Sequence, residues 1–351
     1  MSKNITYLLG AGASYHACPI WKEQGVKMIE LATKFYSNEN VKFTGTKPKN
    51  LSDSDSILWD IGYFGQKAIE FGTIDTYAKK LYLNNSNEDD LQRLKLAVSM
   101  FFTLWESSDD KIKNRKFHQE IEPYKEIDPR YISLLASLLE NNENNNLKIK
   151  DNIKFVTWNY DLQFERAFKS FCPSHQSWDD ISSHLSFRIN SQNNKRLNVC
   201  HLNGYSGFYN INKHNTQKEY HYIDRSESKK IDEILNEINF VCKSLNRGDL
   251  YMNHHINYAW ENNGLAEKIR DEAKKIFQET DILIIIGYSF PPFNKDIDSL
   301  LFSELKNRPT EIYYQDINAS KDYLDILTNG FECKITLIKD KVDHFYLPYT
   351  F

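Results

Sequence analysis

The chain has 351 residues, of which 40% are hydrophobic and 14% aromatic, so it can bury a large core and is not globally disordered. Its formal net charge is −4 and its basic residues form no long run, which argues against direct binding of nucleic acid. The first apolar stretch is too short for a signal peptide or a membrane span, so we expect a cytoplasmic protein without a membrane partner.

The cysteines exclude two further kinds of site. All five are scattered along the chain and none forms a C-x-x-C pair. We therefore expect neither a disulfide framework nor a structural zinc site, and no metal elsewhere. A catalytic thiol is also disfavoured, because a buried cysteine commonly serves as a small hydrophobic residue.

The N-terminal segment has the pattern of a strand, a glycine-rich turn and a helix. Residues 5–10 form an apolar run that ends in glycine, and helical spacing follows. Residues 41–55 lose this periodicity and are rich in Gly, Pro, Ser and Asp, which indicates a loop. Between 57 and 140 apolar residues recur three or four apart, so we expect a helical insertion at 45–140 that contains no strand.

Strands and helices alternate after this insertion. Helical patterns separate apolar segments at 153–158, 196–202, 281–290, 311–317 and 333–339. Near-continuous apolar strands of this kind are typical of a parallel sheet with helices on both faces. The sequence predicts an α/β fold with a doubly wound, mainly parallel Rossmann-like sheet, built as a single domain over 1–351 with a short tail at 339–351.

Ligands of such sheets bind at the carboxyl ends of the strands. At the first strand end, Gly10 and Gly12 could let a pyrophosphate approach the backbone. Tyr15 replaces the third glycine of G-x-G-x-x-G, and Glu30 lies in a helix rather than after a second strand, so an ordinary Rossmann dehydrogenase is disfavoured. A turn that is needed only for tight packing is the alternative.

Polar residues follow two more strands. At the second strand end Asp161 suits a helix N-cap, with Glu165 available to the first turn, whereas Asn159 is harder to explain as a cap. The third strand ends at His201, and a single histidine is more often structural than catalytic. The glycines at 204 and 207 that follow it indicate a close approach of the backbone to another group.

The fourth strand end closes the longest apolar run of the chain. Packing alone does not require the polar residues that accompany the glycine found there. They are Gly287, Ser289, Asn294 and Asp298.

Four stretches, in this order, resemble the sirtuin-like domain of bacterial anti-phage proteins that consume NAD: "GAGAS", "TWNYD", "HLNG" and "GYSFPPFN". The resemblance extends from Leu9 to about Asn318. The stretch "TIDTYAKKLYL" is similar to a segment of the same proteins, which adds Asp75 and Thr76 as weaker candidates.

The resemblance implies that NAD+ is the substrate and that Asn159 and His201 are the two catalytic residues. It also implies that the first turn holds the phosphates, that the G-Y-S turn contacts ribose and phosphate, and that a later strand end holds the adenosine ribose. The implied NAD-binding residues are Gly10, Ala11, Gly12, Ala13, Ser14, Thr157, Asp161, Gly287, Ser289, Asn294, Asp316 and Asn318.

Two departures separate the chain from sirtuin deacylases. Those enzymes carry a zinc module with paired cysteines, and a G-I-P-D-F-R stretch follows their first turn. This chain has no such pairs and reads "ACPIW", keeping only Pro19 of that stretch. We therefore expect an NAD+ glycohydrolase that depletes NAD as an abortive-infection effector. The alternatives are a non-catalytic module that senses NAD or ADP-ribose, and a deacylase or ADP-ribosyltransferase.

The chemistry of the expected reaction fits an amide and an imidazole. Cleavage of the nicotinamide–ribose bond develops an oxocarbenium-like cation while a neutral base departs, so the leaving group needs no proton. We expect Asn159 to position the attacking water or a ribose hydroxyl and neutral His201 to accept its proton. Asp161 is expected to orient the turn that carries Asn159.

An unrestrained NADase would harm its host, so we expect gating by homo-oligomerisation or by a separately encoded defence partner. The tail or the 45–140 insertion would provide the contact surface. The alternative for the tail is that its aromatic residues pack on the edge of the sheet.

Overall fold

The structure is a computed structural model that describes residues 3–38, 40–84, 88–107, 112–113, 120–121, 127–141, 147–173, 176–188, 196–213, 216–221, 235, 250–262, 264–308 and 310–349. Contacts between residues divide the chain into two compact units. The first unit comprises 1–15, 127–204 and 257–351, and the second comprises 16–126 and 205–256.

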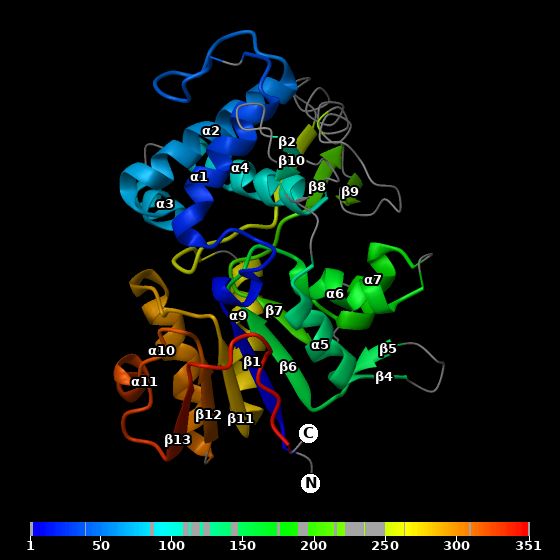
Figure 1. The fold of residues 1–351 in the computed structure, drawn as a ribbon, viewed down its shortest axis with the longest axis vertical. Helices are drawn as coiled ribbons and strands as arrows, with labels where there is room; N and C mark the ends of the chain where they lie inside the picture. Colours follow the sequence, from blue (N-terminus) through cyan, green and yellow to red (C-terminus); the bar gives the residue numbers. More distant parts are fainter. Residues whose placement is uncertain are drawn as a thin grey trace. The chain divides into compact units, whose positions relative to one another are not determined.

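The main sheet of the first unit has six strands in its described part, in the order β13-β12-β11-β1-β6-β7, and every pairing is parallel (Figure 1). The chain builds outward from β1 to β7 and then returns to the other side of β1, which makes the sheet doubly wound. The predicted fold class is therefore confirmed. The strands are β1 (Ile5–Leu9), β6 (Ile153–Thr157), β7 (Val199–His201), β11 (Ile282–Ile286), β12 (Thr310–Gln315) and β13 (Cys333–Ile338).

One row of paired residues crosses the carboxyl end of this sheet. From β12 to β7 the row reads Gln315, Ile286, Leu9, Thr157 and His201. Because all five strands run the same way, the residues that follow these positions meet along one edge of the sheet, which we call the carboxyl edge.

Helices cover both faces of the sheet (Figure 1). On one face Leu8, Val156 and Ile285 share a core with α9 (Gly264–Glu279), α10 (Lys295–Ser303) and α11 (Asp322–Leu327). On the other face the ring of Phe155 lies 4.3 Å from that of Phe164. Phe164 belongs to α6 (Gln163–Phe171), which packs beside α5 (Pro129–Leu138) and α7 (Trp178–Leu185).

The C-terminal segment packs on the face that α5 and α6 cover. Phe345 is buried, and its ring lies 5.0 Å from that of Tyr131 on α5. The side chain of Gln315 fastens this segment: its Nε2 donates to the carbonyl of His344 at 2.6 Å, and its Oε1 accepts from the amide of Tyr346 at 2.9 Å. These contacts support packing as the role of Phe345 and Tyr346, on a face of the sheet rather than its edge.

The second unit contains the helices α1 (Trp21–Phe35), α2 (Asp53–Phe71), α3 (Ile74–Leu83) and α4 (Glu88–Ser107). Polar caps start two of them, since Ser52 accepts from an amide in the first turn of α2 and Thr73 accepts from one in α3. Helices α1 and α2 approach closely because both carry glycine at the contact. A Cβ atom at Gly25 would lie 2.9 Å from the carbonyl oxygen of Gly65.

Of the three small antiparallel sheets in the described part of the chain, two correct the sequence prediction. The expectation of no strand between 57 and 140 is wrong, because β2 (Ile112–Lys113) pairs with β3 (Glu120–Ile121), and β4 (Leu139–Asn141) pairs with β5 (Leu147–Ile149). In the second unit β8 (Phe208–Lys213) lies between β9 (Thr216–His221) and β10 (Leu250–His254). Strands of two or three residues are too short to show the alternation that would reveal them.

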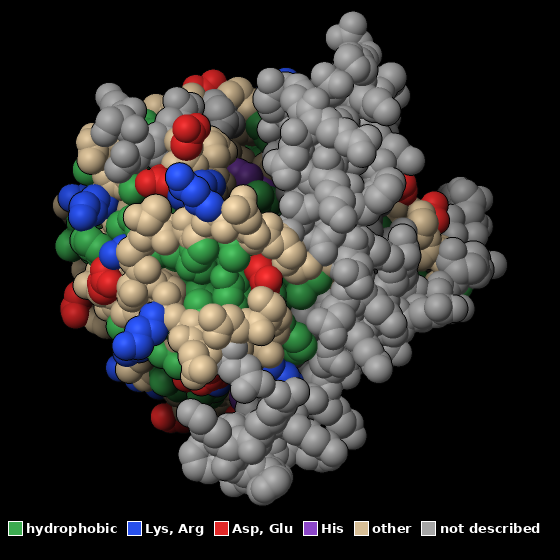
Figure 2. Space-filling model, turned by 90° about the horizontal axis from the view of Figure 1, so that it is seen from above, with side chains coloured by type: hydrophobic (Ala, Val, Ile, Leu, Met, Phe, Trp, Pro, Cys, Tyr) green, Lys and Arg blue, Asp and Glu red, His purple; other side chains and the backbone are tan. Residues whose placement is uncertain are grey.

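Two observations bear on possible macromolecular partners. On the face seen in Figure 2, the described Lys and Arg side chains lie scattered among acidic and polar ones rather than in a basic stripe. Among the described helices, none combines the length and the apolar character that crossing a membrane requires.

Candidate functional site

The glycine-rich turn after β1 packs directly against the turn after β11. Residues 11–14 form a short 3-10 helix, and Gly12 donates its amide to the carbonyl of Gly287 at 2.9 Å. A Cβ atom at Gly10 would lie 2.5 Å from the Cα of Tyr288, and one at Gly287 would lie 2.4 Å from the amide nitrogen of Ala13. Gly287 also has a φ of +60°, which favours glycine. Tight packing of the two turns therefore requires glycine at these positions, and the binding of NAD phosphates there stays a prediction.

The amides of Gly12 and Ala13 in this turn are engaged within the protein. Besides the bond from Gly12, the amide of Ala13 donates to the carbonyl of Gly10 at 2.9 Å. The guanidinium of Arg130 on α5 donates to the carbonyls of Gly12 at 3.0 Å and Ala13 at 3.2 Å. A phosphate bound to the amide of Gly12 or Ala13 would have to replace the bond from that amide to the carbonyl of Gly287 or Gly10.

Ser14 joins the first strand end to the second. It is buried, and its hydroxyl donates to Oδ1 of Asp161 at 2.9 Å. The hydroxyl oxygen of Ser14 also accepts from Nδ2 of Asn159 at 3.2 Å and lies 3.2 Å from the hydroxyl of Tyr131 on α5. The structure therefore brings together three of the predicted site residues, together with a tyrosine that the sequence analysis did not single out.

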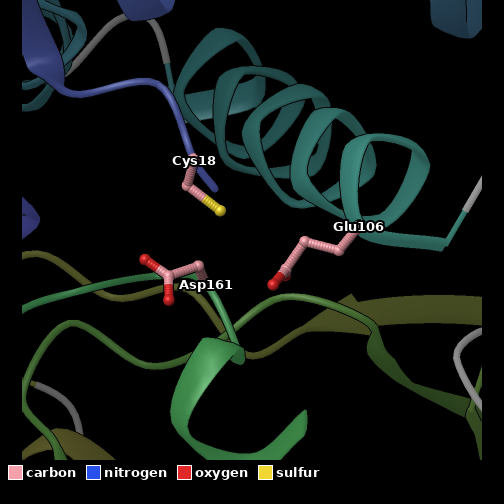
Figure 3. A group of neighbouring side chains, drawn as sticks. All are labelled: Cys18, Glu106 and Asp161. Atoms are coloured by element: carbon pink, nitrogen blue, oxygen red, sulfur yellow. The ribbon is translucent and has the colours of Figure 1, made fainter. Parts of the chain in front are cut away.

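The elbow after β6 has a defined local structure. Asp161 lies in the turn that leads into α6 (Figure 3), and its Oδ1 accepts from the amide of Gln163 at 3.1 Å. The hydroxyl of Thr157 accepts from the backbone amide of Asn159 at 3.1 Å, so the Thr157 side chain stabilises the backbone of the elbow. Burial raises the pKa of Asp161 to about 6, although the bonds from Gln163 and Ser14 favour the charged form. The prediction of Asp161 as the N-cap of α6 is wrong, because Leu162 holds that position, although the Asp161 side chain accepts the amide of the first helical residue.

His201 is paired with a buried carboxylate. Its Nε2 lies 2.7 Å from Oε1 of Glu165, and its Nδ1 lies 3.4 Å from the carbonyl oxygen of Asn159. The exposed fraction is 2% for the His201 side chain and 0% for that of Glu165, so both are shielded from water. Burial lowers the pKa of His201, but the charge and hydrogen bond of Glu165 outweigh it and the pKa is raised.

The turn after β11 leads to a second buried carboxyl group. The Tyr288 hydroxyl lies 3.0 and 2.8 Å from the two carboxyl oxygens of Asp298. Nδ2 of Asn294 donates to the same Tyr288 hydroxyl at 3.0 Å. Burial raises the pKa of Asp298 to about 8, although the hydrogen bond with Tyr288 favours the charged form. Asn294 thus bonds to Tyr288, while Ser289 is exposed.

The remaining candidates lie apart from these contacts. Asp316 directly follows β12 and accepts the amide of Asn318 at 2.7 Å, which forms a local turn. Asn318 is exposed. Asp75 and Thr76 lie in the first turn of α3 in the second unit, where the amide of Thr76 donates to Thr73.

Sequence reasoning gave Glu165 only a role in the first helical turn, and it missed Tyr131 and Arg130. Glu165 is the third residue of α6, and its side chain contacts His201, the last residue of β7. A charged residue within the apolar stripe of "LQFERAF" is the signal that could have marked it, because buried carboxylates are paired. Tyr131 and Arg130 carry no comparable signal, since α5 reads as an ordinary amphipathic helix.

No family model and no curated protein matches the sequence. Solved structures of Sir2 enzymes do match it. One is the structure of a Sir2 enzyme from work on the mechanism and regulation of these enzymes. It matches with a TM-score of 0.38 and 12% identity, over 95% of this chain and 87% of that chain. A mutant Sir2 homologue in complex with ADP-ribose matches with a TM-score of 0.39 and 12% identity, over 97% of this chain and 88% of that chain. At this identity and TM-score the likeness carries no argument about activity, and the fold class rests on the sheet itself.

Proposed function

We propose that the first unit binds NAD+ at the carboxyl edge of its sheet and hydrolyses the nicotinamide–ribose bond, releasing nicotinamide and ADP-ribose. The observation that carries the proposal is the junction at Ser14, which holds Asn159 and Asp161 against the glycine-rich turn. His201 ends the neighbouring strand, directly opposite Thr157 of the elbow. An amide and an imidazole therefore lie at adjacent strand ends, where parallel sheets bind their ligands.

This pair of groups suits the reaction. The amide of Asn159 can orient the attacking oxygen, and the imidazole of His201 can take the proton from it. Because the departing nicotinamide is neutral, the site needs no acid on the leaving-group side. Asp161 acts through the turn by accepting from Ser14 and Gln163.

The direct test is incubation of the purified full chain with NAD+, followed by chromatography for nicotinamide and ADP-ribose. Equimolar appearance of both products supports hydrolysis. Nicotinamide release only when an acyl-lysine peptide is present would instead indicate a deacylase, and transfer of ADP-ribose to protein would indicate a transferase. No release under any of these conditions, including after addition of an extract of phage-infected cells to supply the gating partner, would contradict the proposal.

A non-catalytic module that senses NAD or ADP-ribose is the second candidate. The shielding of His201 favours it, because an imidazole that is only 2% exposed and is paired with Glu165 cannot act on a substrate until its surroundings rearrange. This candidate predicts a higher melting temperature with NAD+ or ADP-ribose and no nicotinamide release.

We further propose that the activity serves anti-phage defence in the bacterial cytoplasm by depleting NAD, gated by a partner protein or by oligomerisation. The support is the resemblance of the four strand-end stretches to such proteins. The proposal predicts that infected cells expressing the protein lose NAD, and that cells expressing Asn159→Ala do not. Equal NAD levels and equal phage yields in both strains would exclude a defence role.

A further inference from the structure

The buried pair of Glu165 and His201 has a feature that packing does not explain. Glu165 is fully shielded, and its Oε1 contacts Nε2 of His201 at 2.7 Å. Its second oxygen, Oε2, is also buried and has no hydrogen-bond partner among the described residues. A buried carboxylate is costly unless it is compensated, so the histidine is the group that compensates this charge.

The surroundings of His201 define which nitrogen can exchange a proton. Nε2 faces the Glu165 carboxylate at 2.7 Å, and Nδ1 faces the carbonyl oxygen of Asn159 at 3.4 Å, a long hydrogen bond that a substrate oxygen entering beside Asn159 would replace. The charged groups that act on the ring are Glu165 of α6 and, more weakly, Asp161 of the elbow. The ring of Phe187 lies 6.1 Å away, edge to face, and contributes no charge. Nδ1 is thus the nitrogen on the side of the elbow that carries Asn159.

We propose that Glu165 is a positioning residue of the NAD site: it holds Nε2–H of His201, so that Nδ1 exchanges the proton with the attacking oxygen beside Asn159. This inference rests on the proposed NAD hydrolysis. In the step, the bond between nicotinamide nitrogen and ribose carbon breaks and its electron pair leaves with nicotinamide. The oxygen of water bonds to that carbon and its proton passes to Nδ1. The imidazolium, stabilised by the Glu165 carboxylate, then releases the proton to solvent.

The test uses the full chain with Glu165→Gln, which keeps the size of the side chain and an acceptor oxygen but removes the charge. Nitrogen-15 NMR of labelled histidine follows the His201 ring against pH, with the signal assigned by its loss in His201→Gln. Loss of an adjacent negative charge is expected to lower the titration midpoint of His201 by about 1 unit or more. The acidic limb of the nicotinamide-release profile is expected to move to lower pH by the same amount. Glu267→Gln, an exposed carboxylate on α9, is the control and is expected to move neither.

The outcomes separate the inference from the function it rests on. A His201 midpoint that stays unchanged in Glu165→Gln, or one that moves while the acidic limb stays in place, overturns the positioning role. Wild-type protein that releases no nicotinamide even with an extract of phage-infected cells added, with a His201 midpoint that still depends on Glu165, overturns NAD hydrolysis alone. Circular dichroism confirms folding, and Glu165→Asp, which restores the charge, is expected to recover part of the shift.

Discussion

The hydroxyl of Ser14 donates a 2.9 Å hydrogen bond to Oδ1 of Asp161, and so fastens the turn after β1 to the elbow after β6. The same oxygen accepts from the side-chain amide of Asn159. The Ser14 side chain therefore helps to position both Asp161 and Asn159 after the neighbouring strand. A substitution at Ser14 is thus a direct way to perturb the candidate site.

Replacement of Ser14 by alanine removes this junction. We expect the free energy of unfolding to fall by about 1–3 kcal/mol, because buried partners are left unsatisfied. The rate of nicotinamide release should also fall in the protein that remains folded, since the Asn159 side-chain amide loses the hydroxyl oxygen to which it donates. Urea unfolding and product chromatography measure the two effects. The control is Ser137→Ala, an exposed serine on α5, and equal behaviour of the two variants would contradict the role of Ser14.

Three glycines separate steric overlap from backbone strain. Gly287→Ala should be the most damaging, because its Cβ would overlap the turn after β1 and its φ is +60°. Gly330 has a φ of +88° with open space around it, so Gly330→Ala should cost only about 1 kcal/mol. Gly264, at the start of α9, has neither constraint, and Gly264→Ala should cost nothing. Thermal unfolding gives the order, and an equal loss for Gly287 and Gly330 would show that the close approach is unimportant.

Asp298 predicts a pH dependence of stability. Its pKa is raised to about 8, against about 4 in an unfolded chain, so the folded state holds this proton more tightly. The contribution is fully present below pH about 4 and is lost as pH rises toward 8. Asp298→Asn should therefore lose stability less steeply than wild type over that range, as urea unfolding at several pH values would measure. Asp296→Asn, exposed on the same helix, should follow wild type, and parallel curves for all three proteins would refute the prediction.

The C-terminal segment is predicted to stabilise the first unit. Phe345 is buried against Tyr131, and the guanidinium of Arg130 lies 4.9 Å from its ring. Phe345→Ala should cost about 3 kcal/mol in unfolding free energy. Tyr349 is fully exposed, so Tyr349→Ala should leave stability unchanged. If only Tyr349→Ala altered binding of a partner or self-association, the exposed end of the tail would be the contact surface.

Much of the sheet could be read from the sequence because its strands are nearly continuous apolar runs. The run "ILIII" of β11 is typical of a strand buried on both faces of a parallel sheet. The alternation of such runs with helical patterns predicts that the other strands are parallel to it. The placement of Asn159 and His201 at strand ends followed directly. The pairing of Glu165 with His201 did not, because it joins residues 36 apart whose contact depends on the adjacency of β6 and β7. Likewise, no local pattern announces that Gln315 fastens the C-terminal segment.

The central claim is that the strand-end amide of Asn159 serves NAD hydrolysis, and the rate of nicotinamide release by Asn159→Ala tests it most directly. The matched control is Asn152→Ala, which alters an asparagine at the opposite end of β6 whose side chain donates to the carbonyl of Lys3 at 2.8 Å. We predict that Asn159→Ala, folded as judged by circular dichroism, loses at least about a hundredfold in turnover, while Asn152→Ala keeps it. Release at the wild-type rate by folded Asn159→Ala would contradict the account.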